Sequence, residues 1–168
     1  MASKGYVISD ATGGITPVGR LYVPMGEISY FSTTGTSIVI SGTSDGSTNM
    51  VVANPTTALS AMSESFDNGG SNNGRLRYTG ATTRMFHIAV TLSGSPEVNG
   101  NVFVFGVANG GVVAAESKTL GSSAGTQFSA LHAYIMLAQN EYLELFIGNT
   151  SSSKNFTIKS LNLFAMGM

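Results

Sequence analysis

The chain has 168 residues, of which 42% are hydrophobic and only 10% are Asp, Glu, Lys or Arg, and its formal net charge is −1. A chain of this length can bury the core of one domain without a disulfide or a metal. It has no cysteine, which excludes a disulfide scaffold, a thiolate zinc site and a cysteine nucleophile. A soluble domain usually has about 25% charged residues. This chain has far fewer, and its polar character comes instead from Ser, Thr, Asn and the 21 Gly.

Charge and hydropathy also narrow the range of partners. Phosphate recognition needs clustered Lys and Arg, whereas Arg75, Arg77 and Arg84 are the only local basic group. No apolar run approaches the roughly 20 residues of a membrane span, and the segment Met1 to Tyr6 lacks the apolar stretch of a signal peptide. We therefore expect a protein made in a cytoplasm, with neither nucleic acid nor membrane as its main partner.

The first predicted element, residues 1–25, differs in kind from the rest of the chain. It contains the glycine pair Gly13-Gly14, two prolines and scattered Tyr and Val, so it cannot bury much surface on its own. We predict an extended N-terminal arm here, followed by one domain at 26–168. The residues of the arm that we expect to attach to a partner are Tyr6, Val7, Ile8, Ile15, Val18, Leu21 and Tyr22.

Residues 26–168 show the pattern of many short strands. Apolar runs rich in Val, Ile, Phe and Tyr recur between clusters of Gly, Asn, Ser and Asp, which is typical of an all-β antiparallel sandwich or barrel. The predicted strands are 27–31, 36–41, 49–53, 74–79, 83–93, 101–108, 111–117, 127–138, 141–148 and 155–166. Asn and Gly tolerate the positive φ of tight turns, which predicts reversals at Asp45-Gly46, Asn68-Gly69-Gly70, Asn73-Gly74, Asn99-Gly100, Asn109-Gly110-Gly111 and Gly148-Asn149.

Three of these strands alternate between a core face and a second face that is also partly apolar. Side chains alternate along a strand, so Phe86, Ile88 and Val90 share one face of the first of them. A sandwich strand of a soluble monomer should have one apolar and one polar face. The second faces comprise Met85, His87, Ala89 and Thr91 in 83–93, Phe128, Ala130, His132, Tyr134 and Met136 in 127–138, and Ser160, Asn162, Phe164 and Met166 in 155–166.

If these strands lie side by side, they expose an apolar patch rimmed by Ser and Asn. Such patches mark protein interfaces, and interface cores favour aromatics and Met over charge. We predict a self-association interface formed by Met85, His87, Phe128, His132, Tyr134, Met136, Asn162, Phe164 and Met166. The alternative is that the arm folds back and covers this face within one chain.

Four segments carry a resemblance to a known family: GRLRYTGATTRMFHIAVTL at 74–92, VFVFGVANG at 102–110, NEYLEL at 140–145 and GEISYF at 26–31. The first resembles the central strands of trimeric tumour-necrosis-factor-like (complement globular-head-like) jelly rolls, and the second resembles the next strand of that family and its turn. The third is similar to that family's Gly-Asp-x-Ile-Glu-Leu, with Asn-Glu in place of Gly-Asp. The fourth resembles the opening strand of the phage versions.

The resemblance implies a jelly roll of about ten strands that trimerises through the sheet holding its first, central and last strands. Phage modules of this kind are capsid decoration proteins, head fibres and tail-fibre tips. The expectation is a homotrimeric decoration protein of a virion, attached through its arm to the major capsid protein or another virion protein. The alternative is a receptor- or glycan-binding tip that uses the loops 42–48, 67–74 and 94–101.

No segment predicts catalysis. Residues 42–46 and 121–125 match Gly-x-Ser-x-Gly, but a nucleophile elbow needs a helix after the turn and neither segment has one. Glu141 and Glu144 are expected at solvated strand edges. We therefore predict no catalytic residue and a protein that is not an enzyme.

Metal and cofactor sites are not predicted either. The turn at 67–74 offers one carboxylate, fewer than a calcium loop needs. His87 and His132 fall on the predicted interface, where copies of one of them around a three-fold axis could bind a metal or an anion. The simpler interpretation is that each is an ordinary hydrogen-bonded histidine within a packed interface, so we expect neither a metal nor a cofactor.

Overall fold

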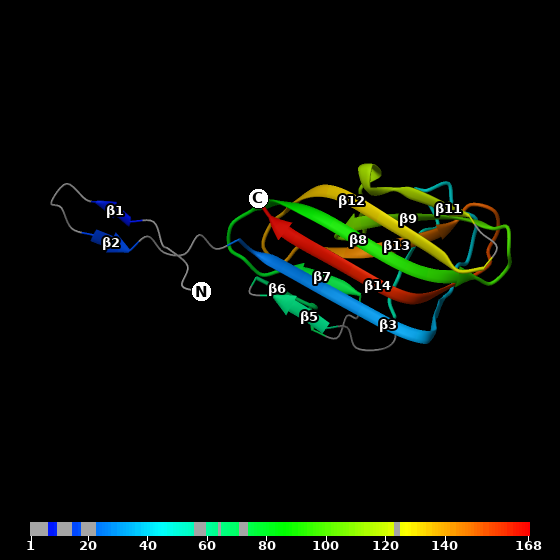
Figure 1. The fold of residues 1–168 in the computed structure, drawn as a ribbon. Coiled ribbons are helices and arrows are strands. Elements are labelled where there is room, and N and C mark those ends of the chain that lie inside the picture. The colour runs from blue at the N-terminus through cyan, green and yellow to red at the C-terminus, as the bar shows by residue number, and fades with distance from the viewer. Residues whose placement is uncertain are drawn as a thin grey trace.

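Two antiparallel β-sheets stack face to face, as Figure 1 shows for this computed structural model. The structure describes residues 7–9, 15–17, 23–55, 60–63, 65–70, 74–122 and 125–168. One sheet, the β8 sheet, has the order β12 (Gln127–Leu137), β8 (Arg84–Pro96), β14 (Phe156–Gly167), β3 (Met25–Ile38) and β5 (Ser60–Ser63).

The other sheet, the β9 sheet, has seven strands. Its main order is β10 (Val112–Val113), β9 (Val102–Asn109), β13 (Tyr142–Asn149), β7 (Arg75–Tyr78) and β6 (Phe66–Asp67), while β11 (Thr119–Ser122) pairs with β9 and β4 (Val51–Val52) with β13. The chain crosses repeatedly between the sheets: β7, β9 and β13 belong to this one, whereas β8, β12 and β14 belong to the other. This connectivity is that of a jelly roll and confirms the predicted fold class.

The core lies between the sheets and contains two aromatic clusters. Phe156 of the β8 sheet packs on Phe103 and Phe105 of the β9 sheet, with ring centroids 5.0 and 5.4 Å apart. Phe86 meets Phe66 and Tyr78 in the same way, at 5.2 and 4.9 Å. Burial of each such ring stabilises the fold by about 1.5–3 kcal/mol, so the two clusters hold the sheets together without disulfides.

Two strand predictions need correction. The segments 27–31 and 36–41 are not separate strands, because β3 runs through the first and on to Ile38 in the second, with a register shift opposite Ile158 and Ser160. Gly35, with φ of 79°, lies in this irregularity. The segment 111–117 is only partly a strand: β10 is followed by a 3-10 turn, η1 (Ala115–Ser117).

Most predicted reversals are confirmed by positive φ, including those at Gly46, Gly100 and Gly110. The one at Gly148-Asn149 is wrong, because both residues lie in β13 opposite Val104 and Phe103. Asn149 is fully buried. Its Nδ2 donates to Asn101 Oδ1 at 3.1 Å and to Lys154 O at 2.9 Å, so it holds the turn that follows the strand.

The predicted arm contains a short antiparallel hairpin that the sequence did not indicate, formed by β1 (Val7–Ser9) and β2 (Ile15–Pro17). The backbones of Val7, Ile8 and Ile15 lie in it. Tyr6, Val18, Leu21 and Tyr22 lie outside the described residues. In the part of the chain that the structure describes, no helix is long and apolar enough to cross a membrane.

Candidate interface on the outer face of the β8 sheet

Side chains that point away from the core form rows across the β8 sheet, and we call this surface the outer face. Its rows follow from the strand registers, because residues opposite one another in neighbouring strands point to the same side. In order along the sheet the rows are Met168, Met85 and Met136; Met25, Met166, His87 and Tyr134; Glu27, Phe164, Ala89 and His132; Ser29, Asn162, Thr91 and Ala130; Phe31, Ser160, Ser93 and Phe128.

All nine predicted interface residues lie on this outer face, and the predicted alternation of buried and outward residues is confirmed in β8, β12 and β14. Phe128 is 82% exposed in the single chain, Tyr134 59% and Met136 52%. Met166 and His132 are also exposed. Half-buried positions are occupied by Met85, His87, Asn162 and Phe164. The face is therefore open to solvent in an isolated chain.

Two exposed apolar residues of the outer face were missed by the sequence prediction. Phe31 is 79% exposed and Met25 is 47% exposed, and both project outward from β3. The signal was present, since Phe31 alternates with the buried Ile28 and Tyr30 in the predicted strand 27–31.

The outer face has an apolar end and a polar middle. The two rows nearest the carboxyl terminus consist of Met, His and Tyr side chains. At the opposite end, Phe31 and Phe128 flank a floor where Ser93 Oγ and Ser160 Oγ lie 2.6 Å apart. The five rows contain one carboxylate, Glu27, which accepts a hydrogen bond from Asn162, and no Lys or Arg. Low charge with exposed aromatics is the composition of an interface core.

The alternative in which the arm covers this face finds no support among the described residues. The arm's two strands, β1 and β2, pair with each other and with no strand of the β8 sheet. Tyr134, Met136 and Phe128 are exposed, and no other described residue packs over them.

The outer face of the β9 sheet is different, because its charges are paired within the chain. Arg75 Nε and Nη2 donate to Glu144 Oε1 at 3.1 and 3.0 Å, and the Arg75 guanidinium lies 3.7 Å above the ring of Tyr142. Glu144 is buried, so its prediction as a solvated edge residue is wrong. The predicted solvated position of Glu141 also needs correction: the residue is half-buried, and its Oε2 accepts from Ala138 N at 2.8 Å.

A second ion pair on this sheet holds the turn that follows β6. Arg77 donates two hydrogen bonds to Asp67, at 2.8 and 2.7 Å, and Gly69 N donates a third at 2.8 Å. Hydrogen bonding to Arg77 lowers the pKa of Asp67 below its usual value. Both carboxylate oxygens of Asp67 are therefore used in hydrogen bonds within the chain.

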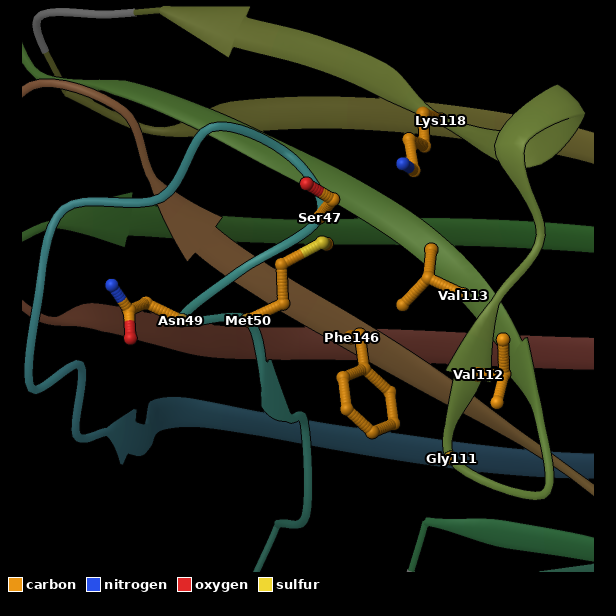
Figure 2. A pocket seen from close by; sticks show the side chains of 8 residues that line it. All are labelled: Ser47, Asn49, Met50, Gly111, Val112, Val113, Lys118 and Phe146. Carbon is orange, nitrogen blue, oxygen red and sulfur yellow. The ribbon is translucent and has the colours of Figure 1, made fainter.

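A depression of about 370 Å³ lies on the same side of the molecule, and Figure 2 shows its lining. Phe146 of β13, Met50 and Val113 supply apolar surface, while Ser47 and Lys118 supply a hydroxyl and a cation. The volume falls within the range of small-molecule sites. This depression adjoins the predicted receptor-binding loop 42–48 and contains an aromatic ring.

Ser44, the central serine of 42–46, does not resemble a nucleophile. It is buried, its Oγ donates to Thr48 O at 2.6 Å, and it lies in a loop with no helix after it. The central serine of 121–125 lies outside the described residues.

The two histidines are in contact on the outer face. His87 Nε2 and His132 Nδ1 are 3.2 Å apart, and the rings stack at 15° with centroids 5.4 Å apart. Tyr134 lies beside His87, at 5.3 Å between centroids. The sequence did not predict this contact between the two rings.

Comparisons with known proteins reveal similarity of structure only. No protein-family model matches the sequence, and a search of curated proteins finds no match. Solved structures similar to this chain include murine APRIL at pH 5.0, with 10% identity, TM-score 0.49, and coverage of 86% of this chain and 98% of that one. The globular domain of zebrafish complement 1qA protein has 10% identity and TM-score 0.48 over 88% of this chain and 97% of its own.

Vertex protein P5 of the phage PRD1 is also similar, with 14% identity and TM-score 0.46 over 86% of this chain and 96% of that one. These similarities are of structure and do not extend to assembly or partners.

Proposed function

We propose that the chain is a non-enzymatic structural protein of a virion that works as a homotrimer, closed through the outer face of the β8 sheet. One observation carries the self-association: Phe31, Phe128 and Tyr134 are each more than half exposed on a single face. Exposed apolar patches of this kind usually mark interfaces. The number of subunits and the virion location are supported by the sequence resemblance to trimeric phage modules.

Within the virion, the proposed role is that of a capsid decoration protein, and the arm is the proposed attachment to the major capsid protein or another virion protein. The proposal places Val7, Ile8 and Ile15, with the other arm residues named above, in the contact with that virion protein. An attachment element separate from the trimer interface lets assembly and attachment be tested independently.

The test is a deletion of residues 1–22 in the full chain. Val23 to Met25 are kept because Pro24 O accepts a hydrogen bond from Gly167 N at 2.8 Å, inside the domain. The shortened chain should keep the mass of the assembly in light scattering and lose co-sedimentation with particles of the virus. A Val112→Ser variant, altered on the β9 sheet, is the control and should retain both. Undiminished co-sedimentation of the shortened chain would refute attachment through the arm.

A second function, a receptor- or glycan-binding tip, is favoured by the depression in Figure 2. Phe146 offers an aromatic surface beside the hydroxyl of Ser47 and the cation of Lys118. Binding of the pure protein to host cells, lost in Phe146→Ala and Lys118→Ala and accompanied by no affinity for capsids, would favour this function over decoration.

A further inference from the structure

The histidine pair, His87 and His132, is a feature that the proposed trimer does not require. His132 lies opposite Ala89 and His87 opposite Tyr134, so the two imidazoles are diagonal neighbours on adjacent strands. Diagonal positions are within reach of long side chains. Their nitrogens, 3.2 Å apart, come from residues that are 45 positions apart in sequence, and no other hydrogen bond of either ring is found among the described residues.

The spacing of the nitrogens suits a shared metal ion. Zinc bonds to imidazole nitrogen at about 2.0–2.1 Å with tetrahedral angles, so two nitrogens on one ion are about 3.3 Å apart. In the metal-free pair one ring N–H donates to the other ring. When the donor ring takes its other neutral tautomer, the proton moves to the nitrogen that faces away from the partner ring. Both facing nitrogens then carry a lone pair that can bind a metal ion.

The surroundings select the class of ion. Ala89, Tyr134 and Met166 lie next to the pair in the rows of the outer face, and the carboxylate of Glu27 is separated from His132 by Phe164 and Ala89. Ca²⁺ and Mg²⁺ need several oxygen ligands, which this surface does not offer. Imidazoles suit zinc, nickel and copper.

We propose that His87 and His132 chelate one late transition-metal dication, of the Zn²⁺ or Ni²⁺ class, on each chain. Among the described residues no cluster of three or more His, Cys, Asp or Glu could hold a metal. The remaining coordination positions therefore fall to water or to donors of a second copy at the outer face.

The test is a calorimetric titration of Zn²⁺, and separately of Ni²⁺, into the full chain without a polyhistidine tag. Wild type should bind one ion per chain. His87→Gln and His132→Gln should each weaken binding by at least about tenfold, since the second imidazole of a chelate binds intramolecularly. The double variant should be no weaker than either single one. Val112→Ser, which alters an exposed residue of the β9 sheet, is the control and should bind as wild type does.

Three outcomes would overturn the chelate: no binding by wild type at millimolar metal, single variants within twofold of wild type, or single variants that each lose half of the sites. Thermal melting of every variant shows that the fold is retained. Light scattering on the same samples reports the assembly separately, so failure of the metal site and absence of the trimer are distinguishable.

Discussion

The outer faces of the two sheets differ in where their side chains find partners. On the β9 sheet, Arg75 and Glu144 pair with each other, and Arg77 pairs with Asp67. On the β8 sheet, Phe128 and Tyr134 project into solvent with nothing above them in the described chain. The first surface pairs these charged groups within the chain, whereas the aromatic rings of the second have no cover among the described residues. Similar strands can therefore serve either folding or assembly, according to the side chains that alternate outward.

The largest expected effect is loss of assembly when charge is placed on the outer face of the β8 sheet. Tyr134→Asp and Phe164→Asp should each yield monomers or insoluble protein, because an interface cannot bury an unpaired carboxylate without a large desolvation cost. Light scattering measures the mass. Val112→Asp, on the β9 sheet at a site 75% exposed, is the matched control and should leave the assembly intact. Unchanged assemblies from both test variants would remove these residues from the interface.

The next effect concerns the β9 sheet and should appear in stability instead of assembly. Arg75→Ala leaves Glu144 buried without its partner, which should lower the free energy of unfolding by about 1–3 kcal/mol. Urea denaturation measures this change, and light scattering of the folded variant should give the wild-type mass. A loss of assembly without a loss of stability would contradict the assignment of roles to the two faces.

A smaller effect tests whether the interface extends across the outer face as far as β3. Phe31→Ala removes an exposed ring from β3 and should raise the dissociation constant of the assembly about tenfold, which corresponds to about 1.4 kcal/mol. Sedimentation over a dilution series measures it. Stability of the isolated fold should not change, since Phe31 contributes little to the core. An unaltered dissociation constant would confine the interface to β12, β8 and β14.

The smallest effect is the acid dependence of the Asp67–Arg77 pair. The pKa of Asp67 is lowered in the fold by Arg77, so the pair stabilises the protein above the unfolded pKa of about 3.9 and loses this contribution as pH falls through the lower folded value. Asp67→Asn should melt slightly earlier than wild type at pH 7, and the difference should shrink in acid, below the unfolded pKa of about 3.9. Melting curves between these limits measure it, and a difference that grows on acidification would contradict the sign.

Period-two alternation was enough to predict the core and outer residues of β8, β12 and β14, because each strand is long and its inward positions are uniformly apolar. Short strands such as β11 were missed, since Thr119 to Ser122 has only one large apolar residue, Leu120, and its strand conformation depends on pairing with β9. The burial of Glu144 could not be predicted, because Arg75 is 69 residues away in sequence. The contact of His87 with His132 depends on strand register, which alternation alone does not fix.

The mass of the full chain in dilute solution is the most direct test of the proposed assembly. Sedimentation or light scattering at micromolar concentration should give about three times the 17.4 kDa of one chain. A stable 17.4 kDa species that remains soluble, with Phe128 and Tyr134 accessible to solvent, would contradict the claim that copies of the chain cover the outer face of the β8 sheet.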